Sequence, residues 1–337
     1  MVSNYIKSFI RDLPKVELHL HLEGAIPLNT LLQLIEKYKG KNYITLTELQ
    51  QKFTYTNFTN FIDIWYWKNN YIREYVDYEF IAEHVAFNLA EQNIRYAEIY
   101  FSPSDFAKIN SQPQEIANSI RKGLNKHSDK ITINLIADLV RDKEPKISLL
   151  EQISEVRDQG IIGIGLGGDE LQFPPILFTD VFRKAKKMGF FTTCHAGEVA
   201  GPNYIWQAIR DLNVQRIGHG TSAAKDRELV NYLIDNKIPL EMCPISNVRT
   251  TSVASLADHP INDFYNSGMI VSINTDDPKM FNTTLVKEYG SLIDTFDLDL
   301  SDIYNLAQNC IESAWCTKNT KKELNNELTQ YCKRYIN

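Results

Sequence analysis

Eight short runs of apolar and β-branched residues recur along this chain and limit the folds that it can adopt. They cover residues 16–22, 95–101, 131–139, 161–166, 190–195, 216–219, 238–243 and 270–275. After the second run, successive runs begin roughly 30 residues apart, and the segments between them have the apolar spacing of helices. A strand followed by a helix, repeated eight times, favours a closed barrel over an open sheet. We therefore predict an α/β fold, a (β/α)8 TIM barrel, in which residues 1–337 form a single domain.

One gap in this spacing is much longer than the others. Residues 24–94 lie between the first two runs, whereas a single crossover helix needs far fewer. Phe58, Phe61 and Trp65 recur in this segment at the spacing of one helical face. One interpretation is that this face packs against the barrel like any other helix. The other is that it forms an apolar cap over the mouth, because the insertion leaves from the carboxyl end of the first strand; both can hold together. Helical patterns at 302–314 and 321–335 predict extra helices after the last strand.

The composition argues against several kinds of protein. The chain is 43% hydrophobic and 23% charged, with a formal net charge of −6, which is ordinary for a folded domain. Its acidity gives no general attraction to phosphate backbones, and no apolar run approaches the roughly 20 residues that span a bilayer. The five cysteines show no C-x-x-C spacing, which argues against a disulfide framework and a thiolate zinc site. We therefore expect a cytoplasmic protein that binds a small molecule and neither nucleic acid nor membrane; no oligomeric state is predicted.

Polar side chains collect where several of these runs end. The first run reads ELHLHLE, and its two-residue alternation places His19 and His21 on one side, facing the barrel axis. The fifth run contributes His195 and the eighth leads into Asp276. Neutral imidazoles and a carboxylate are ligands that zinc accepts, and catalytic zinc sites keep one further position free for water. The pattern therefore predicts a zinc site formed by His19, His21, His195 and Asp276.

Further residues next to these ligands are candidates for the chemistry. Glu198 follows His195 by three residues and could act as a general acid without being a ligand. His219, at the end of the sixth run, could orient or deprotonate a water molecule, as could Asp276. Asp277 is suited to a polar ring atom of a substrate. The fourth run ends in glycines, which have no side chain to keep a flat ligand away from the backbone: Gly165, Gly167 and Gly168. Such glycines are equally typical of a tight strand end.

With these motifs, the chain resembles the adenosine/adenine deaminase family of metal-dependent amidohydrolase barrels. The matching segments are LPKVELHLHLEGAI at 13–26, GGDE at 167–170, CHAGE at 194–198, RIGHG at 216–220, CPISN at 243–247 and NTDDP at 274–278. The resemblance implies hydrolytic deamination of a 6-aminopurine with one zinc ion. It implies that Glu198 protonates purine N1 and that His219 and Asp276 handle the water that attacks C6. It also places the remaining substrate contacts, with N3 at the Gly168 backbone and N7 at Asp277, and His21 against the substrate.

The resemblance leaves the group on purine N9 open. Adenosine-specific members have Asp after the H-x-H-L motif, where it meets the ribose 5′-hydroxyl, whereas this chain has Glu23. The HLEG sequence of this chain at 21–24 resembles that of adenine deaminases and aminodeoxyfutalosine deaminases. NVRT at 247–250 and NTDDPKMF at 274–281 look more like nucleoside-acting members. We therefore expect a deaminase of adenosine and 2′-deoxyadenosine in purine salvage, with adenine or aminodeoxyfutalosine as the alternative substrates.

Three other classes fit the sequence less well. A cytidine-type zinc deaminase needs P-C-x-x-C, which does not occur here. A binuclear amidohydrolase would use a lysine on the fourth strand, which reads IIGIGLGG. A barrel kept only for binding would lack a ligand or the acid, and none is missing. The other three histidines are interpreted as structural or solvated: His84, His127 and His259. Cys194 is interpreted as a small core residue that points away from the side of His195, into the layer between strands and helices.

Overall fold

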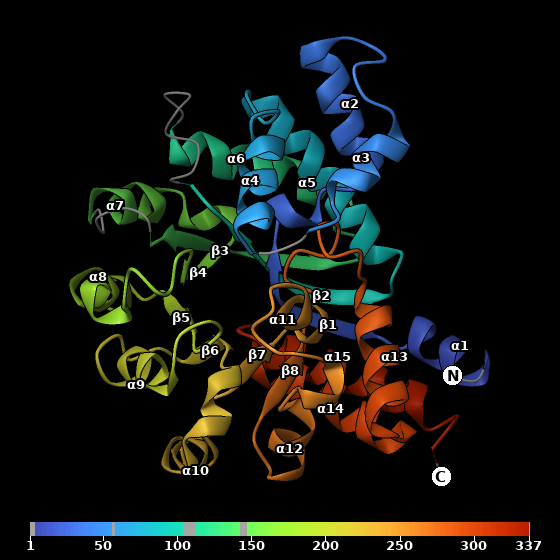
Figure 1. The fold of residues 1–337 in the computed structure, drawn as a ribbon, viewed down its shortest axis with the longest axis vertical. Coiled ribbons are helices and arrows are strands. Elements are labelled where there is room, and N and C mark those ends of the chain that lie inside the picture. The colour runs from blue at the N-terminus through green and yellow to red at the C-terminus, as the bar shows by residue number, and fades with distance from the viewer. Residues whose placement is uncertain (1–3, 56–57, 104–111, 142–146, 337) are drawn as a thin grey trace.

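The computed structural model describes residues 4–55, 58–103, 112–141 and 147–336 (Figure 1). Its centre is one eight-stranded parallel sheet in which neighbouring strands follow the order of the chain. The strands are β1 (Lys15–His21), β2 (Ile94–Phe101), β3 (Thr132–Val140), β4 (Ile161–Gly167), β5 (Phe191–Ala196), β6 (Arg216–His219), β7 (Leu240–Met242) and β8 (Val271–Ile273). All eight predicted strands are therefore present.

The last strand meets the first at the point where the first carries its histidines. The backbone N–H of His21 donates to the carbonyl of Asp276 (2.9 Å), and the N–H of Asp276 donates to the carbonyl of His19 (3.0 Å). The side chain of Asn274 extends this pairing, because its Oδ1 accepts hydrogen bonds from the N–H groups of Leu18 and His19. These bonds bring the two ends of the sheet together, and the predicted (β/α)8 barrel is confirmed.

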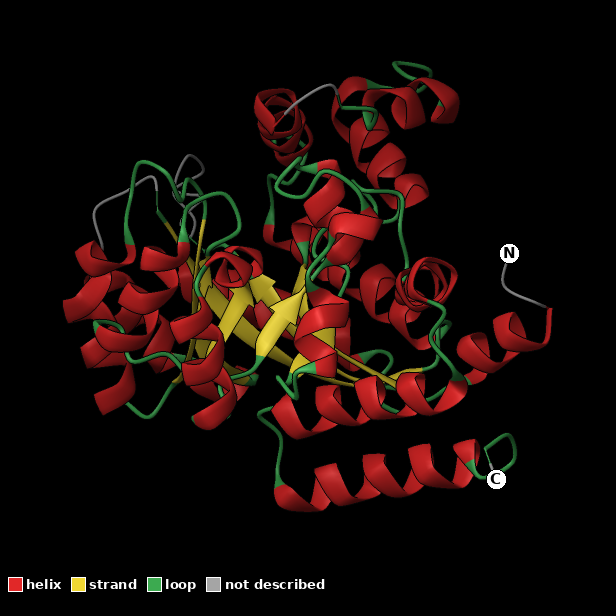
Figure 2. Ribbon diagram, turned by 60° about the horizontal axis from the view of Figure 1, so that its bottom comes forward, coloured by secondary structure: helices red, strands yellow, loops and turns green. Residues whose placement is uncertain are grey.

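Helices surround the strands on the outside (Figure 2). The crossovers from β2 to β8 contain α6 (Pro113–Asn125), α7 (Ile147–Glu155), α8 (Thr179–Lys187), α9 (Pro202–Arg210), α10 (Arg227–Asp235), α11 (Pro244–Arg249) and α12 (Ile261–Asn266). The predicted C-terminal helices are also present, as α13 (Leu285–Phe296), α14 (Leu300–Ser313) and α15 (Lys318–Cys332). The N-terminal helix α1 (Asn4–Asp12) packs on the end of the chain through Phe9, whose ring centroid lies 5.0 Å from that of Tyr335. None of the helices in the described ranges is both long and apolar enough to cross a bilayer.

The alternation predicted for β1 is present in the structure. Leu18, Leu20 and Leu22 are fully buried in the core between barrel and helices, while His19 and His21 face the opposite side. The strands β7 and β8 are shorter than the runs that predicted them. Pro244 comes shortly after β7 and has no N–H to extend the ladder, so the chain leaves the sheet early there. Beyond β8, Asp276 has a left-handed backbone with φ 61° and still pairs with β1.

The long segment between β1 and β2 is helical. It contains a short 3-10 turn at Glu23–Ala25, followed by α2 (Leu28–Lys39), α3 (Leu46–Lys52), α4 (Phe58–Asn69) and α5 (Tyr75–Ala90). On α4, Phe61 stacks on Phe281 from the loop after β8, with ring centroids 5.1 Å apart. The side chain of Phe58 lies outside the described part of the structure. Helix α4 is therefore packed next to the strand end that carries Asp276.

Candidate active site

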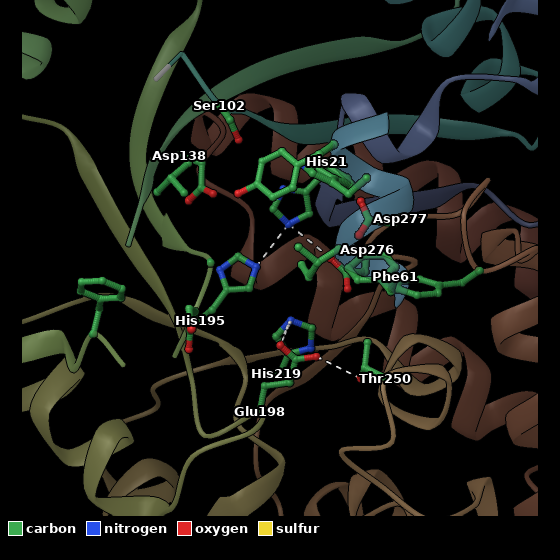
Figure 3. Close-up of a pocket in the computed structure, with 18 of the residues that line it drawn as sticks. His21, Phe61, Ser102, Asp138, His195, Glu198, His219, Thr250, Asp276 and Asp277 are labelled. Atoms are coloured by element: carbon green, nitrogen blue, oxygen red, sulfur yellow. Dashed lines mark hydrogen bonds and ion pairs between the residues drawn. The ribbon is translucent and has the colours of Figure 1, made fainter. Parts of the chain in front are cut away.

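A cavity of about 410 Å³ lies at the carboxyl ends of the barrel strands, where TIM barrels hold their active sites. Figure 3 shows titratable side chains from several strands pointing into it. One wall is apolar and comes from α4 and from the loops after β4 and β8: Phe61, Trp65, Tyr66, Phe173 and Phe281. Polar residues that follow or end β2, β3 and β4 also line it, together with Gly168: Ser102, Asp138, Asp169 and Gln172.

The predicted metal ligands come together at the base of this cavity. The ligand atoms of His19, His21, His195 and Asp276 all lie within 4.8 Å of one another, and all four residues are buried. Nε2 of His21 lies 3.2 Å from Nε2 of His195 and 3.3 Å from Oδ1 of Asp276. Nε2 of His19 lies 3.5 Å from the same oxygen. Residues from β1, β5 and the end of β8 thus form one cluster.

This cluster fits a divalent cation. Nε2 of His19 is buried and has no hydrogen-bond partner among the described residues. The Nε2 atoms of His21 and His195 face each other, and only one of two such nitrogens can donate to the other. A cation between them would instead use both lone pairs. Three imidazole nitrogens and one carboxylate oxygen are a donor set that catalytic zinc accepts.

Two of the imidazoles are held so that Nε2 faces the cluster. Nδ1 of His19 lies 2.9 Å from Oε2 of Glu241, and Nδ1 of His195 lies 3.1 Å from the carbonyl of Leu166. Burial raises the pKa of Glu241, but Arg216 and His19 outweigh it and lower the pKa to about 2. An ionised Glu241 accepts the Nδ1–H of His19, which leaves Nε2 free for a metal. Arg216 Nε in turn lies 2.5 Å from Glu241 Oε1.

Glu198 lines the cavity and belongs to the loop after β5, which is held in place by Glu170. The carboxylate of Glu170 accepts hydrogen bonds from four successive backbone N–H groups, at residues 197–200. Burial, together with the charges of Asp276 and Glu170, raises the pKa of Glu198 to about 8. Glu198 therefore carries a proton at neutral pH, as a general acid requires.

His219 and Asp277 complete the cluster of titratable groups. Burial lowers the pKa of His219 to about 3, so its imidazole is neutral at physiological pH. Burial and the charge of neighbouring Asp276 together raise the pKa of Asp277 to about 7. Its Oδ1 is buried without a hydrogen-bond partner among the described residues. A Cβ on Gly24 would lie 1.7 Å from this oxygen, so the glycine of HLEG makes room for the Asp277 carboxyl.

Glu23 lies behind the cavity and is not among its lining residues. It is 1% exposed, and its Oε1 accepts a hydrogen bond from the backbone N–H of Ser102 (3.2 Å). Burial raises the pKa of Glu23. Ser102 itself lines the cavity, so Glu23 reaches the cavity wall through Ser102. Gly168, by contrast, lines the cavity with φ 98°, a conformation that favours glycine.

Other residues of the site were not predicted from the sequence: Ser102, Asp138, Glu170, Glu241 and Thr250. Two of them carry a signal that could have been used. Glu241 is a charged residue inside a buried strand, and Glu170 is the last residue of the GGDE motif. Cys194, interpreted as a small core residue, is fully buried in the hydrophobic core.

The fold and the cluster together define a metal-dependent hydrolase of the amidohydrolase kind. The family model described as "Adenosine deaminase" matches residues 14–331, and the chain belongs to the adenosine deaminase family. The resemblance noted from the motifs is thereby confirmed. Members of this family are hydrolytic deaminases that act on C–N bonds, and the activity of this chain is the deamination of adenine-type substrates.

Relatives of similar identity carry different substrate names. An aminodeoxyfutalosine deaminase of Streptomyces avermitilis is 32% identical, covering 98% of this chain and 94% of the relative. An adenosine deaminase of Clostridium kluyveri is also 32% identical, covering 96% of this chain and 95% of the relative. The crystal structure of an adenine deaminase from Arthrobacter aurescens superimposes with a TM-score of 0.90 at 28% identity, covering 95% of this chain and 99% of that one.

Proposed function

We propose that this protein is a zinc-dependent deaminase of 6-aminopurine nucleosides, which converts adenosine and 2′-deoxyadenosine to inosine and 2′-deoxyinosine with release of ammonia in purine salvage. The observation that carries this proposal is the extent of the cavity beyond the titratable cluster. Its volume of about 410 Å³ lies in the range of pockets that hold whole small ligands. Ser102, Asp138 and Gln172 line it and could hydrogen-bond the hydroxyl groups of a sugar.

The metal would be held by His19, His21, His195 and Asp276. Zinc in this set would supply Lewis acidity that lowers the pKa of water toward about 7. Glu198, protonated at neutral pH, would give its proton to purine N1 and so make C6 electrophilic. Asp277, with its raised pKa, would donate a hydrogen bond to N7, which is an acceptor. The backbone of Gly168 would contact N3, and His219 would act on the attacking water.

A second candidate is the deamination of aminodeoxyfutalosine or of another purine with an extended 5′ group. The apolar wall favours it, because Phe61, Trp65 and Phe173 offer surface for a substituent larger than a hydroxyl. The relative from Streptomyces avermitilis carries this name at 32% identity. Helix α4, with Phe61 and Trp65, would then cover the mouth of the site, which is one of the two interpretations of the insertion. Adenine remains the third candidate, and only a direct comparison of substrates separates the three.

The substrate assignment predicts an order of kcat/KM values over a panel of 6-aminopurines. We expect adenosine, 2′-deoxyadenosine and 5′-thioether nucleosides to be processed faster than free adenine, because only they can use the polar residues beyond the catalytic cluster. The panel, with aminodeoxyfutalosine included, is measured at one pH with the zinc-loaded enzyme. Adenine faster than adenosine by about tenfold or more would overturn the nucleoside proposal, because unpaired hydrogen-bonding groups discriminate strongly.

Substitution of Glu23 adds a control to this panel. Glu23→Asp shortens the side chain that holds the backbone N–H of Ser102, so the wall beyond the catalytic cluster should shift. We expect kcat/KM for nucleosides to change while kcat/KM for adenine stays near the parent value. An equal change for both substrates would show that Glu23 acts on the chemistry and not on the N9 substituent.

The raised pKa of Glu198 predicts how activity depends on pH. Glu198 must be protonated to act as an acid, and its pKa of about 8 lies above the usual value for Glu. Glu198 is therefore protonated below that pH and loses its proton as the pH rises through it. Above it, each further pH unit should lower kcat/KM about tenfold. A pH profile of kcat/KM with adenosine measures this limb. A profile that stays flat to two units above pH 8 would remove Glu198 from this role.

A further inference from the structure

A buried histidine outside the cavity, His259, has a fixed arrangement of its ring protons. It follows the short 3-10 turn Leu256–Asp258 and is 3% exposed. Its Nδ1 accepts a hydrogen bond from the backbone N–H of Ile261 (3.2 Å). A backbone N–H can only donate, so Nδ1 has no proton, and the ring proton sits on Nε2. That Nε2 lies 3.2 Å from Oδ1 of Asn247 and donates to it.

The proton on His259 sets the orientation of the next residue, Asn247. This side chain on α11 is fully buried. Because its Oδ1 accepts from His259, its Nδ2 is the atom that faces His219, 3.0 Å from Nδ1 of that ring. An amide nitrogen donates, so Nδ1 of His219 is an acceptor. In the neutral imidazole of His219 the single proton is therefore on Nε2.

Nε2 of His219 faces the cavity. His219 lines the cavity, and its Nε2 lies 3.6 Å from Oε2 of Glu198 (Figure 3). No residue in the described ranges forms a hydrogen bond with this nitrogen, although it is buried. Because Nδ1 of the same ring accepts from Asn247, the ring carries a single proton and is neutral. A donor directed into the site without a protein partner is placed to bind an oxygen atom there.

We propose that His259 and Asn247 are positioning residues, which hold His219 in the tautomer that directs Nε2–H into the active site. His219 is then a hydrogen-bond donor, and it has no lone pair at Nε2 with which to take a proton. The same tautomer explains why His219 stands beside the four ligands without joining them, since a protonated nitrogen does not bind a metal.

The role of this donor in the reaction rests on the proposed deamination. Water bonds to C6 through its oxygen, and one of its O–H bonds breaks. His219 holds the oxygen by donating to it, and the proton passes to a carboxylate, for which the sequence candidate is Asp276. The C6–N bond then breaks, and the amino group leaves as ammonia with that proton. The hydroxyl left on C6 gives its proton to the carboxylate of Glu198, which had protonated N1, so the 6-oxopurine forms and the acid is restored. Two residues that contact no substrate would thus decide whether His219 donates or accepts.

The tautomer can be measured without catalysis. In the zinc-loaded protein with ¹⁵N-labelled histidine, the ring nitrogens of His219 are assigned by loss of their signals in His219→Gln. We expect Nε2 protonated and Nδ1 unprotonated in the parent protein. Nδ1 protonated in the parent protein would overturn the proposal, whatever the substrate proves to be.

Asn247→Asp is the sharpest variant, because it replaces the donor toward His219 with an acceptor of the same shape. The proton of His219 should move to Nδ1, and kcat should fall about 10²- to 10⁴-fold, as in a triad whose histidine takes the wrong tautomer. KM should change much less. Asn236→Asp, an exposed site with the same chemical change, is the matched control and should leave both unchanged.

A second variant keeps the test valid if the buried charge of Asn247→Asp prevents folding. His259→Phe removes the donor that orients Asn247, so both tautomers of His219 should be populated and kcat should fall by a smaller factor. Zinc content is measured on each variant, because loss of metal would show damage to the ligand cluster. Parent-like tautomer and kcat in a folded, zinc-containing Asn247→Asp or His259→Phe protein would overturn the proposal.

Discussion

Replacing His195 with alanine is expected to remove both the metal and the activity. The parent protein should contain about one equivalent of zinc, because four ligand atoms converge on one point. His195 supplies one of three imidazoles, and its Nδ1 is fixed by the carbonyl of Leu166. Loss of a residue that only hydrogen-bonds a metal ligand typically costs about 10- to 100-fold in metal affinity or activity. Loss of the ligand itself should therefore cost more. Elemental analysis and a deaminase assay measure both effects.

The control for this variant is His127→Ala, at a half-buried histidine after α6 that lies outside the cluster. It should keep its zinc and its rate. Thermal unfolding of both variants shows whether His195→Ala is folded. A His195→Ala protein that retains one zinc and full activity would exclude His195 as a ligand. Two equivalents of metal in the parent protein would exclude the mononuclear site.

Glu198→Gln is expected to keep its zinc and to lose most of its rate. Glutamine has the same shape and can still accept the hydrogen bond from Thr250, which lies 3.3 Å from Oε1 of Glu198. It cannot give an acidic proton to the purine ring, and removal of a positioned acid typically costs about 10²- to 10⁴-fold. The measurement is kcat at saturating adenosine together with zinc content.

Glu228→Gln is the matched control, because Glu228 is exposed on α10 and is not among the residues that line the cavity. It should behave like the parent protein. The part of the alkaline fall of kcat/KM that centres near pH 8 should disappear from the residual activity of Glu198→Gln, since that acid is gone, and only the titration of Asp277 near pH 7 should remain. A near-parental rate would mean that the proton comes from another group, and loss of zinc would place Glu198 among the ligands.

The barrel and the convergence of its ligands were predictable because they follow from local pattern. Alternation along β1 places His19 and His21 on one side, and parallel strands of a barrel all end at the same face. The alternation in residues 16–22 could be recognised from this segment alone, without knowing which strands lie next to it. The lengths of β7 and β8 were not predictable in this way, because they depend on backbone geometry: Pro244 has no N–H after β7, and beyond β8 the left-handed Asp276 pairs with β1.

The residues that support the ligands could not be predicted because their roles depend on distant contacts. Glu241 acts on His19 across 222 positions of the chain, and Glu170 holds a loop 27 to 30 positions away. His259 was interpreted as structural or solvated, which a lone histidine in a loop usually is. Its contact with Asn247 depends on how the loop after η6 (Leu256–Asp258) packs against α11. The spacing of residues in the sequence does not predict such a contact between a loop and a helix.

The first and last strands of the barrel meet along a few residues, and these carry three of the four candidate ligands. Leu18 and Asn274, which are paired here, stand 256 positions apart, so this join has the highest loop-closure cost in the sheet and should form late in folding. A cation bound to both strands would hold the two ends of the chain together. At a thousandfold excess over its Kd, such binding contributes about 4 kcal/mol to stability. Metal supply would then set how much intact protein survives proteolysis in a cell, in addition to how fast each molecule works.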